Sequence, residues 1–127
     1  MRIDQVRWQA VVSCTPDTKV STVRALLDLH EADGVLLIDS GVVMGCVSKL
    51  DLQYHGLDVA TGRDRQAVGP YGHGSTFIVT AGMDVQDVLS RMRRNHIPIM
   101  PVQQNGALAG IVSIDMLTAG LATSSRN

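Results

Sequence analysis

Aromatic side chains are scarce in this sequence, with one Trp, two Tyr and one Phe among 127 residues. Proteins that bind single-stranded nucleic acid stack bases on such rings. A formal net charge of −1 also provides no positive field to attract phosphates. The scarcity of aromatic rings and the net charge both argue against nucleic acid as a partner, and we expect none. The core has to be built from aliphatic side chains and methionine, which the hydrophobic share of 45% supplies.

Long hydrophobic runs are absent as well. No stretch approaches the roughly 18 apolar residues of a membrane span, and the polar opening MRIDQVRW does not resemble a signal peptide. We therefore expect a cytoplasmic protein with no membrane partner.

Cysteine is rare: Cys14 and Cys46 have a spacing that fits neither a disulfide framework nor a zinc motif. The four histidines show no metal-ligand spacing, and the sequence contains no phosphate-binding P-loop and no nucleophile elbow. These absences predict a protein that is not an enzyme, with no catalytic residue, no metal site and no required cofactor. Both cysteines are expected to be buried packing residues, with a redox role as the alternative.

An internal repeat becomes visible when the sequence is compared with itself at an offset of 65 residues. Gly45 then aligns with Gly110, and Ser48 aligns with Ser113. The matched positions are turn glycines, core residues and a serine at the end of a strand, which are the places where a shared fold would put them. The sequence therefore predicts two copies of one unit.

The elements of the unit are clearest in the second copy. Apolar residues recur there with the 3.6-residue period of a helix, and Asp84 is a suitable N-cap. The sequence Asn105-Gly106 between apolar runs predicts a two-residue hairpin, because both residue types accept positive φ. The apolar positions of the helix are Val85, Val88, Leu89 and Met92.

Each copy is expected to fold as β-α-β-β-α, which gives an α+β protein. We expect one module over residues 1–127, with residues 1–66 as repeat 1 and its connection and residues 67–127 as repeat 2. Residues 56–75 are rich in Gly, Arg and Asp and are interpreted as the connection between copies. Two glycines flank His73 and permit a close approach of the backbone. His73 itself fits a ligand contact and a solvated loop residue equally well.

These features resemble the cystathionine-β-synthase (CBS) domain. The resemblance is carried by the repeated unit, by the strand Ile97–Val102, by the Asn105-Gly106 turn and by Gly110–Ser113. Two such units in tandem resemble a CBS pair, or Bateman module, over nearly the whole chain. The resemblance implies that the repeats pack through their sheets with pseudo-twofold symmetry. It also implies a regulatory protein that forms a homodimer and controls a partner protein.

The resemblance further implies clefts for an adenosine-containing ligand such as AMP, ADP, ATP or S-adenosylmethionine. Asp51 can accept hydrogen bonds from two ribose hydroxyls, and Ser48, one turn before it, can reach ribose or phosphate. Lys49 or His96 could meet phosphate charge. By analogy with the family, the second repeat provides the other wall of the cleft. The further contacts expected in this cleft are Gly74, Phe77, Ile78, Ile97, Pro98, Met100 and Pro101.

A second cleft is expected to be weaker. Asp115 lies one residue earlier than the position equivalent to Asp51, which turns its carboxylate by about 100° around a helix. Leu36 also replaces the proline that the second copy has in its strand. We therefore expect one competent site per chain. The residues assigned to the weaker cleft are Ser113, Asp115, Val35 and Leu36.

Two alternatives stay open. Ser48 and Asp51 could be only the N-cap and the N3 carboxylate of a capping box, which stabilises the start of a helix. The whole module could likewise be a structural dimerisation module whose nucleotide clefts are vestigial.

Overall fold

The computed structural model describes residues 1–74 and 78–124, and the chain divides into two compact units. We call Val11–Thr76 the first-repeat unit. Met1–Ala10 and Phe77–Asn127 together make the second-repeat unit. Each unit is described by itself. None of the helices in the described residues combines the length and the apolar character that crossing a membrane requires.

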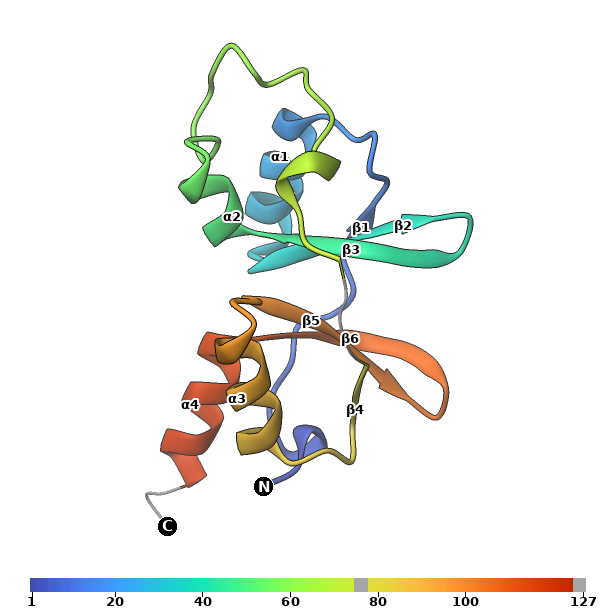
Figure 1. The fold of residues 1–127 in the computed structure, drawn as a ribbon, viewed down its shortest axis with the longest axis vertical. Coiled ribbons are helices and arrows are strands. Elements are labelled where there is room, and N and C mark those ends of the chain that lie inside the picture. The colour runs from blue at the N-terminus through green and yellow to red at the C-terminus, as the bar shows by residue number, and fades with distance from the viewer. Residues whose placement is uncertain (75–77, 125–127) are drawn as a thin grey trace. The chain divides into compact units, whose positions relative to one another are not determined.

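The first-repeat unit contains a three-stranded sheet in the order β1-β2-β3. β1 runs parallel to β2, and β2 runs antiparallel to β3. Both α-helices cover the same face of this sheet (Figure 1). The elements are β1 (Ser13–Cys14), α1 (Val20–His30), β2 (Gly34–Asp39), β3 (Val42–Ser48), α2 (Lys49–Tyr54) and the 3-10 helix η2 (Gly69–Tyr71).

The second-repeat unit has the same order and pairing of strands, β4-β5-β6, with its helices on one face (Figure 1). The predicted β-α-β-β-α order and the α+β class are therefore confirmed. The elements are the 3-10 helix η1 (Ile3–Gln5), β4 (Val79–Thr80), α3 (Val85–Arg94), β5 (Ile99–Gln104), β6 (Ala107–Ser113) and α4 (Ile114–Ser124).

The two hairpins have the turns that the sequence predicts. Asn105 and Gly106 have φ values of 55° and 78°, and Ser40 and Gly41 have φ values of 51° and 79°. Positive φ at both central residues is the type I′ geometry, whose twist matches that of the flanking strands. The hairpin therefore joins β5 to β6, and likewise β2 to β3, without a longer loop.

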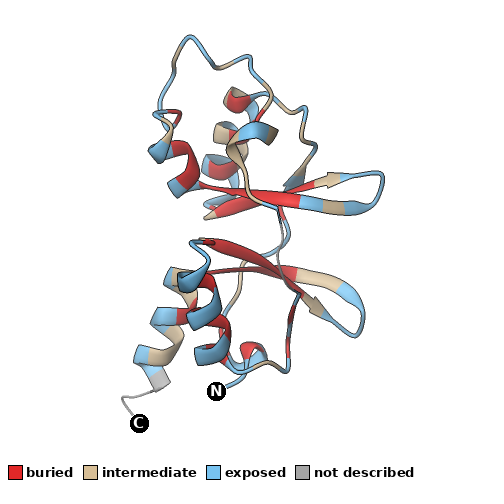
Figure 2. Cartoon of the chain, viewed as in Figure 1, coloured by how far each residue is buried: buried red, intermediate tan, exposed pale blue. Residues whose placement is uncertain are grey.

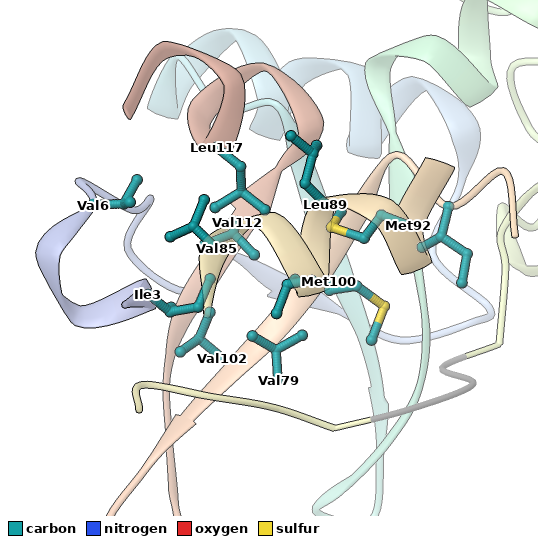
Figure 3. Close-up of a cluster of buried hydrophobic side chains, with 12 residues drawn as sticks. Ile3, Val6, Val79, Val85, Leu89, Met92, Met100, Val102, Val112 and Leu117 are labelled. Carbon is teal, nitrogen blue, oxygen red and sulfur yellow. The ribbon is translucent and has the colours of Figure 1, made fainter. Parts of the chain in front are cut away.

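The predicted apolar stripe of α3 is confirmed. The four stripe residues are all buried, and the Asp84 side chain caps the helix by accepting a hydrogen bond from the backbone N–H of Asp87 at 3.2 Å. Figure 3 shows the stripe residues Val85, Leu89 and Met92 in one cluster with the strand residues Met100, Val102 and Val112. In each unit the buried residues concentrate in the strands and in parts of the helices (Figure 2).

A segment ahead of each repeat completes the core of the other unit. We call residues 1–9 the N-terminal lead segment and residues 66–74 the inter-repeat lead segment. The backbone N–H of Ile3 donates to Met83 at 2.9 Å, and that of Val68 donates to Thr18 at 2.8 Å. These two hydrogen bonds are equivalent at the offset of 65 residues, so each unit takes the segment that precedes the other repeat. Ile3 is visible within the core of the second-repeat unit (Figure 3).

The sequence indicates that residues 56–75 connect the two copies, but residues of this stretch also pack into a core. Leu57 and Val68 are both fully buried in the core of the first-repeat unit. The compact units are also bounded differently from the expected division between residues 66 and 67. That division of the repeats stays a prediction, whereas the packed units include the lead segments.

An ion pair fixes the same stretch to α1. The Arg24 guanidinium donates to both carboxylate oxygens of Asp64, at 3.2 and 2.9 Å, and to the carbonyl of Leu57 at 3.1 Å. The hydrogen bond from Arg24 is the main reason that the pKa of Asp64 lies below its ordinary value. One side chain of α1 therefore holds the start and the middle of the stretch together.

Replacement of Leu57 by Ala should destabilise the protein by about 2–5 kcal/mol, because it leaves a cavity in the core. Val59→Ala is the matched control, since Val59 is 61% exposed, and it should change stability by no more than about 0.5 kcal/mol. Urea unfolding followed by circular dichroism measures both. Equal stability of the two variants would show that this stretch is a linker and not part of the core.

Candidate functional site

The candidate site begins where β3 passes into α2. Ser48 is extended, with φ −101° and ψ 165°, and is the N-cap of α2. Its Oγ accepts a hydrogen bond from the backbone N–H of Asp51 at 3.1 Å. In return, Asp51 Oδ2 accepts from the backbone N–H of Ser48 at 2.8 Å. Ser48 and Asp51 therefore form a capping box, which was one of the two interpretations of these residues from the sequence. Its hydrogen bonds hold the Asp51 carboxylate in a fixed plane.

The other oxygen of the same carboxylate meets a histidine. Asp51 Oδ1 lies 2.5 Å from His73 Nε2. The Ser48 hydroxyl also donates to Oδ2, at 2.9 Å. The side chain of Asp51 is 11% exposed and that of His73 is 32% exposed. The carboxylate is thus nearly buried, with donors on both of its oxygens.

Backbone pairing holds His73 in this position. The N–H of Cys46 donates to the His73 carbonyl at 2.8 Å, and the N–H of His73 donates to the Cys46 carbonyl at 2.9 Å. Such a close approach leaves no room for side chains. A Cβ at Gly72 would lie 2.7 Å from the Cys46 carbonyl, and one at Gly45 would collide with the His73 carbonyl. The close backbone approach predicted at Gly72 therefore has a partner, which is β3.

The second-repeat unit has the same backbone arrangement without the carboxylate. Gln9 forms the equivalent bridge to Ile111, with hydrogen bonds of 2.9 Å in both directions. Ser113 Oγ accepts from the backbone N–H of Met116 at 3.0 Å, so Met116 holds the position that corresponds to Asp51. Asp115 is exposed on α4. In the predicted weaker cleft, Asp115 therefore does not occupy the position that Asp51 has in the first repeat. Whether a ligand binds in that cleft stays a prediction.

Cys46 lies next to this carboxylate and is fully buried. Burial, and then the negative charge of Asp51, raise the pKa of the Cys46 thiol to about 12. Burial also raises the pKa of Cys14. Because the thiolate is the reactive form of cysteine, Cys46 is inert near neutral pH. These facts favour the packing role expected for both cysteines.

The other predicted residues of the first-repeat unit differ in burial. Lys49 and Gly74 are exposed, whereas Val35 and Leu36 are buried in β2. Lys49 lines a surface hollow of about 240 Å³ that does not include Asp51. Although Lys49 is close to Asp51 in the sequence, it lines a different part of the surface, so its position does not favour a contact with a ligand bound at Asp51. The hollow is lined by Arg24, Leu27, Asp28, Lys49, Leu52, Gln53 and Asp58.

The remaining predicted residues belong to the second-repeat unit. Ile97, Met100 and Pro101 are buried, Pro98 is half-buried, and His96 and Ile78 are exposed. The Pro98 carbonyl accepts from the backbone N–H of Ile114 at 3.1 Å, which ties this strand start to the start of α4. Phe77 lies outside the described residues. The predicted contacts thus form one group in each unit, and the composite cleft that would join the groups stays a prediction.

Sequence reasoning did not place His73 beside Asp51. The two residues are 22 positions apart, and a single sequence contains no period or motif that pairs them. The available signal was the pair of glycines around His73, which indicated a close backbone approach without naming the partner.

The family model of the CBS domain matches residues 75–122. A CBS-domain-containing protein from Agrobacterium tumefaciens has 24% identity and a TM-score of 0.75, with 89% of this chain and 90% of that chain covered.

Two further similar structures contain ligands. The CBS domain of a bacterial CNNM/CorC family Mg²⁺ transporter, in complex with ATP, has 19% identity and a TM-score of 0.73, with 96% of this chain and 87% of that chain covered. A CBS-domain pair in complex with 5′-methylthioadenosine and S-adenosyl-L-methionine has 12% identity and a TM-score of 0.78, with 98% of each chain covered.

The second repeat therefore matches the CBS domain by sequence, and the chain as a whole has the fold of a tandem CBS-domain pair. The predicted resemblance is confirmed. Neither the matched family nor these three structures is described as an enzyme.

Replacement of Ser48 by Ala should destabilise the protein by at least about 2 kcal/mol. The change removes a helix cap and one hydrogen bond to a buried carboxylate, which contribute roughly 0.5–2 and 1.5–3 kcal/mol respectively. Ser90→Ala, at an exposed position of α3, is the control and should be neutral or slightly stabilising. Urea unfolding of both variants checks the difference, and a loss at Ser48 no larger than at Ser90 would contradict it.

Proposed function

We propose that this protein is a regulatory module that binds an adenosine-containing ligand, with Asp51 accepting hydrogen bonds from the ribose. The observation that carries the proposal is the nearly buried Asp51 carboxylate, oriented by Ser48 at the junction of β3 and α2. A carboxylate in a fixed plane can accept from two neighbouring hydroxyls, which is the pattern of a ribose diol.

The solved structures with the same fold support this class of ligand. ATP, 5′-methylthioadenosine and S-adenosylmethionine, which occur in two of them, share an adenosine group and differ in what is attached to its 5′ position. A site that reads the ribose suits all three. The proposal therefore names adenosine as the recognised part, with AMP, ADP, ATP and S-adenosylmethionine as candidates.

The chemistry of such a site is compatible with a regulatory role. Hydrogen bonds to a charged group contribute roughly 1.5–3 kcal/mol each, which suits reversible binding of a metabolite. The thiol of Cys46 is unreactive, as its raised pKa indicates. We therefore propose that ligand occupancy controls a partner protein and that the ligand is not transformed.

A second candidate function is self-association, and one observation favours it. Leu50 and Tyr54 are 58% and 87% exposed and lie one turn apart on the same side of α2. Leu29 on α1 is 76% exposed. Exposed apolar groups of this kind are typical of interaction surfaces. A homodimer that uses these two helices would bury them.

Adenine ligands should stabilise the protein through Asp51. At 100 times its dissociation constant, a ligand adds about 2.7 kcal/mol, which raises the melting temperature by several degrees. A thermal-shift series with AMP, ADP, ATP and S-adenosylmethionine measures this. Asp51→Asn should lose most of the shift, because an amide accepts at only one oxygen.

Asp115→Asn is the matched control and should keep the shift of the wild-type protein. Absence of a shift with all four ligands, or an equal shift in Asp51→Asn, would contradict the proposed function.

The double variant Leu50→Ser and Tyr54→Ser tests self-association. We expect a dimer for the wild-type protein and a monomer for the variant in sedimentation velocity experiments, because the variant removes exposed apolar area. Val42→Ser, at a residue that is 58% exposed in the β2–β3 hairpin, should stay dimeric. A wild-type protein that is monomeric at every concentration would refute this candidate.

A further inference from the structure

The hydrogen-bonding capacity of Asp51 is nearly filled without any ligand. A carboxylate offers about four acceptor positions, two on each oxygen. Oδ2 accepts from the backbone N–H and from the hydroxyl of Ser48, at 2.8 and 2.9 Å. Oδ1 faces His73 Nε2 at 2.5 Å. Among the residues that the structure describes, these donors leave one acceptor position, on Oδ1, whereas a ribose diol brings two donors.

The competing group is held near the carboxylate but not locked there. Backbone hydrogen bonds to Cys46 fix the main chain of His73, and the absence of a side chain at Gly45 and Gly72 permits that approach. The imidazole is 32% exposed, so it can turn towards solvent about its own side-chain bonds while the backbone bridge stays intact. The Ser48 donors belong to the cap and cannot leave without opening the start of α2.

We propose, on the basis of the function proposed above, that His73 is an internal competitor for the ribose site. Its imidazole occupies the place of one ribose hydroxyl on Asp51 Oδ1. A ribonucleoside ligand has to displace it before both hydroxyls can bind. His73 therefore lowers the affinity for the ligand and sets the concentration at which the module responds.

The same count of acceptors predicts an effect on selectivity. A ribose ligand gains two hydrogen bonds to Asp51 and breaks one with His73. A 2′-deoxyribose ligand gains one hydrogen bond at the remaining position and breaks none. With His73 present, the two ligands therefore gain equally at Asp51. Without His73, the ribose ligand gains one more hydrogen bond than its deoxy counterpart.

Isothermal titration calorimetry with ATP and 2′-deoxy-ATP tests this inference on the full chain. His73→Ala should lower the dissociation constant for ATP about tenfold, which corresponds to about 1.4 kcal/mol. The dissociation constant for 2′-deoxy-ATP should stay within about twofold. His30→Ala, at the exposed end of α1, is the control and should match the wild-type protein with both ligands.

The outcomes separate the inference from the function on which it rests. Unchanged or weaker binding of ATP by His73→Ala, with binding by the wild-type protein, overturns the inference alone and makes His73 a residue that positions Asp51. No binding of ATP, AMP or S-adenosylmethionine by any of the three proteins overturns the proposed function as well. If only His73→Ala binds ATP, and the wild-type protein and His30→Ala do not, the inference is supported, because His73 then prevents binding altogether.

A test without ligand examines the contact itself. In a double-mutant cycle with His73→Ala and Asp51→Ala, the two losses of stability should be less than additive, because each variant removes the same contact. Additive losses would show that the imidazole does not hold the carboxylate in solution. That result overturns the inference whatever the ligand measurements give.

Discussion

The Asp51 carboxylate couples three parts of the first-repeat unit, because all three meet at it. The end of β3 supplies Ser48, α2 supplies Asp51 itself, and the inter-repeat lead segment supplies His73. A carboxylate that is nearly buried costs free energy unless it is paired and hydrogen-bonded. The position of the helix start and the path of residues 66–74 are therefore coupled through one side chain.

The second-repeat unit is an internal control for what the fold alone requires. It has the same strand order and the same serine cap, with Met116 where the first repeat has Asp51 and with Gln9 in the bridge that His73 forms. The backbone arrangement is thus reached without an acid and without a histidine. The Asp51–His73 pair therefore exceeds what this backbone arrangement needs, which is why we propose that Asp51 binds the ligand and that His73 competes with it.

Much of the fold follows from local rules that a sequence displays. The apolar period of α3 and the residues with positive φ at 105 and 106 are local features, and the offset of 65 residues extended them to both copies. The packing of the lead segments was not predictable in this way. Residues 56–75 have a polar composition without a period, and Leu57 and Val68 become core residues through contacts with distant elements. The same holds for the candidate site. The spacing of Ser48 and Asp51 can be read from the sequence, whereas the contact of His73 with Asp51 depends on the tertiary structure.

The most direct test of this account is a crystal structure of the chain with the adenine ligand that gives the largest thermal shift. The account predicts ribose hydroxyls within hydrogen-bonding distance of Asp51, with the Ser48 cap intact and the His73 imidazole turned away from Oδ1. A ligand bound away from Asp51 would contradict the proposed function. A ligand whose two ribose hydroxyls both reach Asp51 while His73 keeps its contact would contradict the competition.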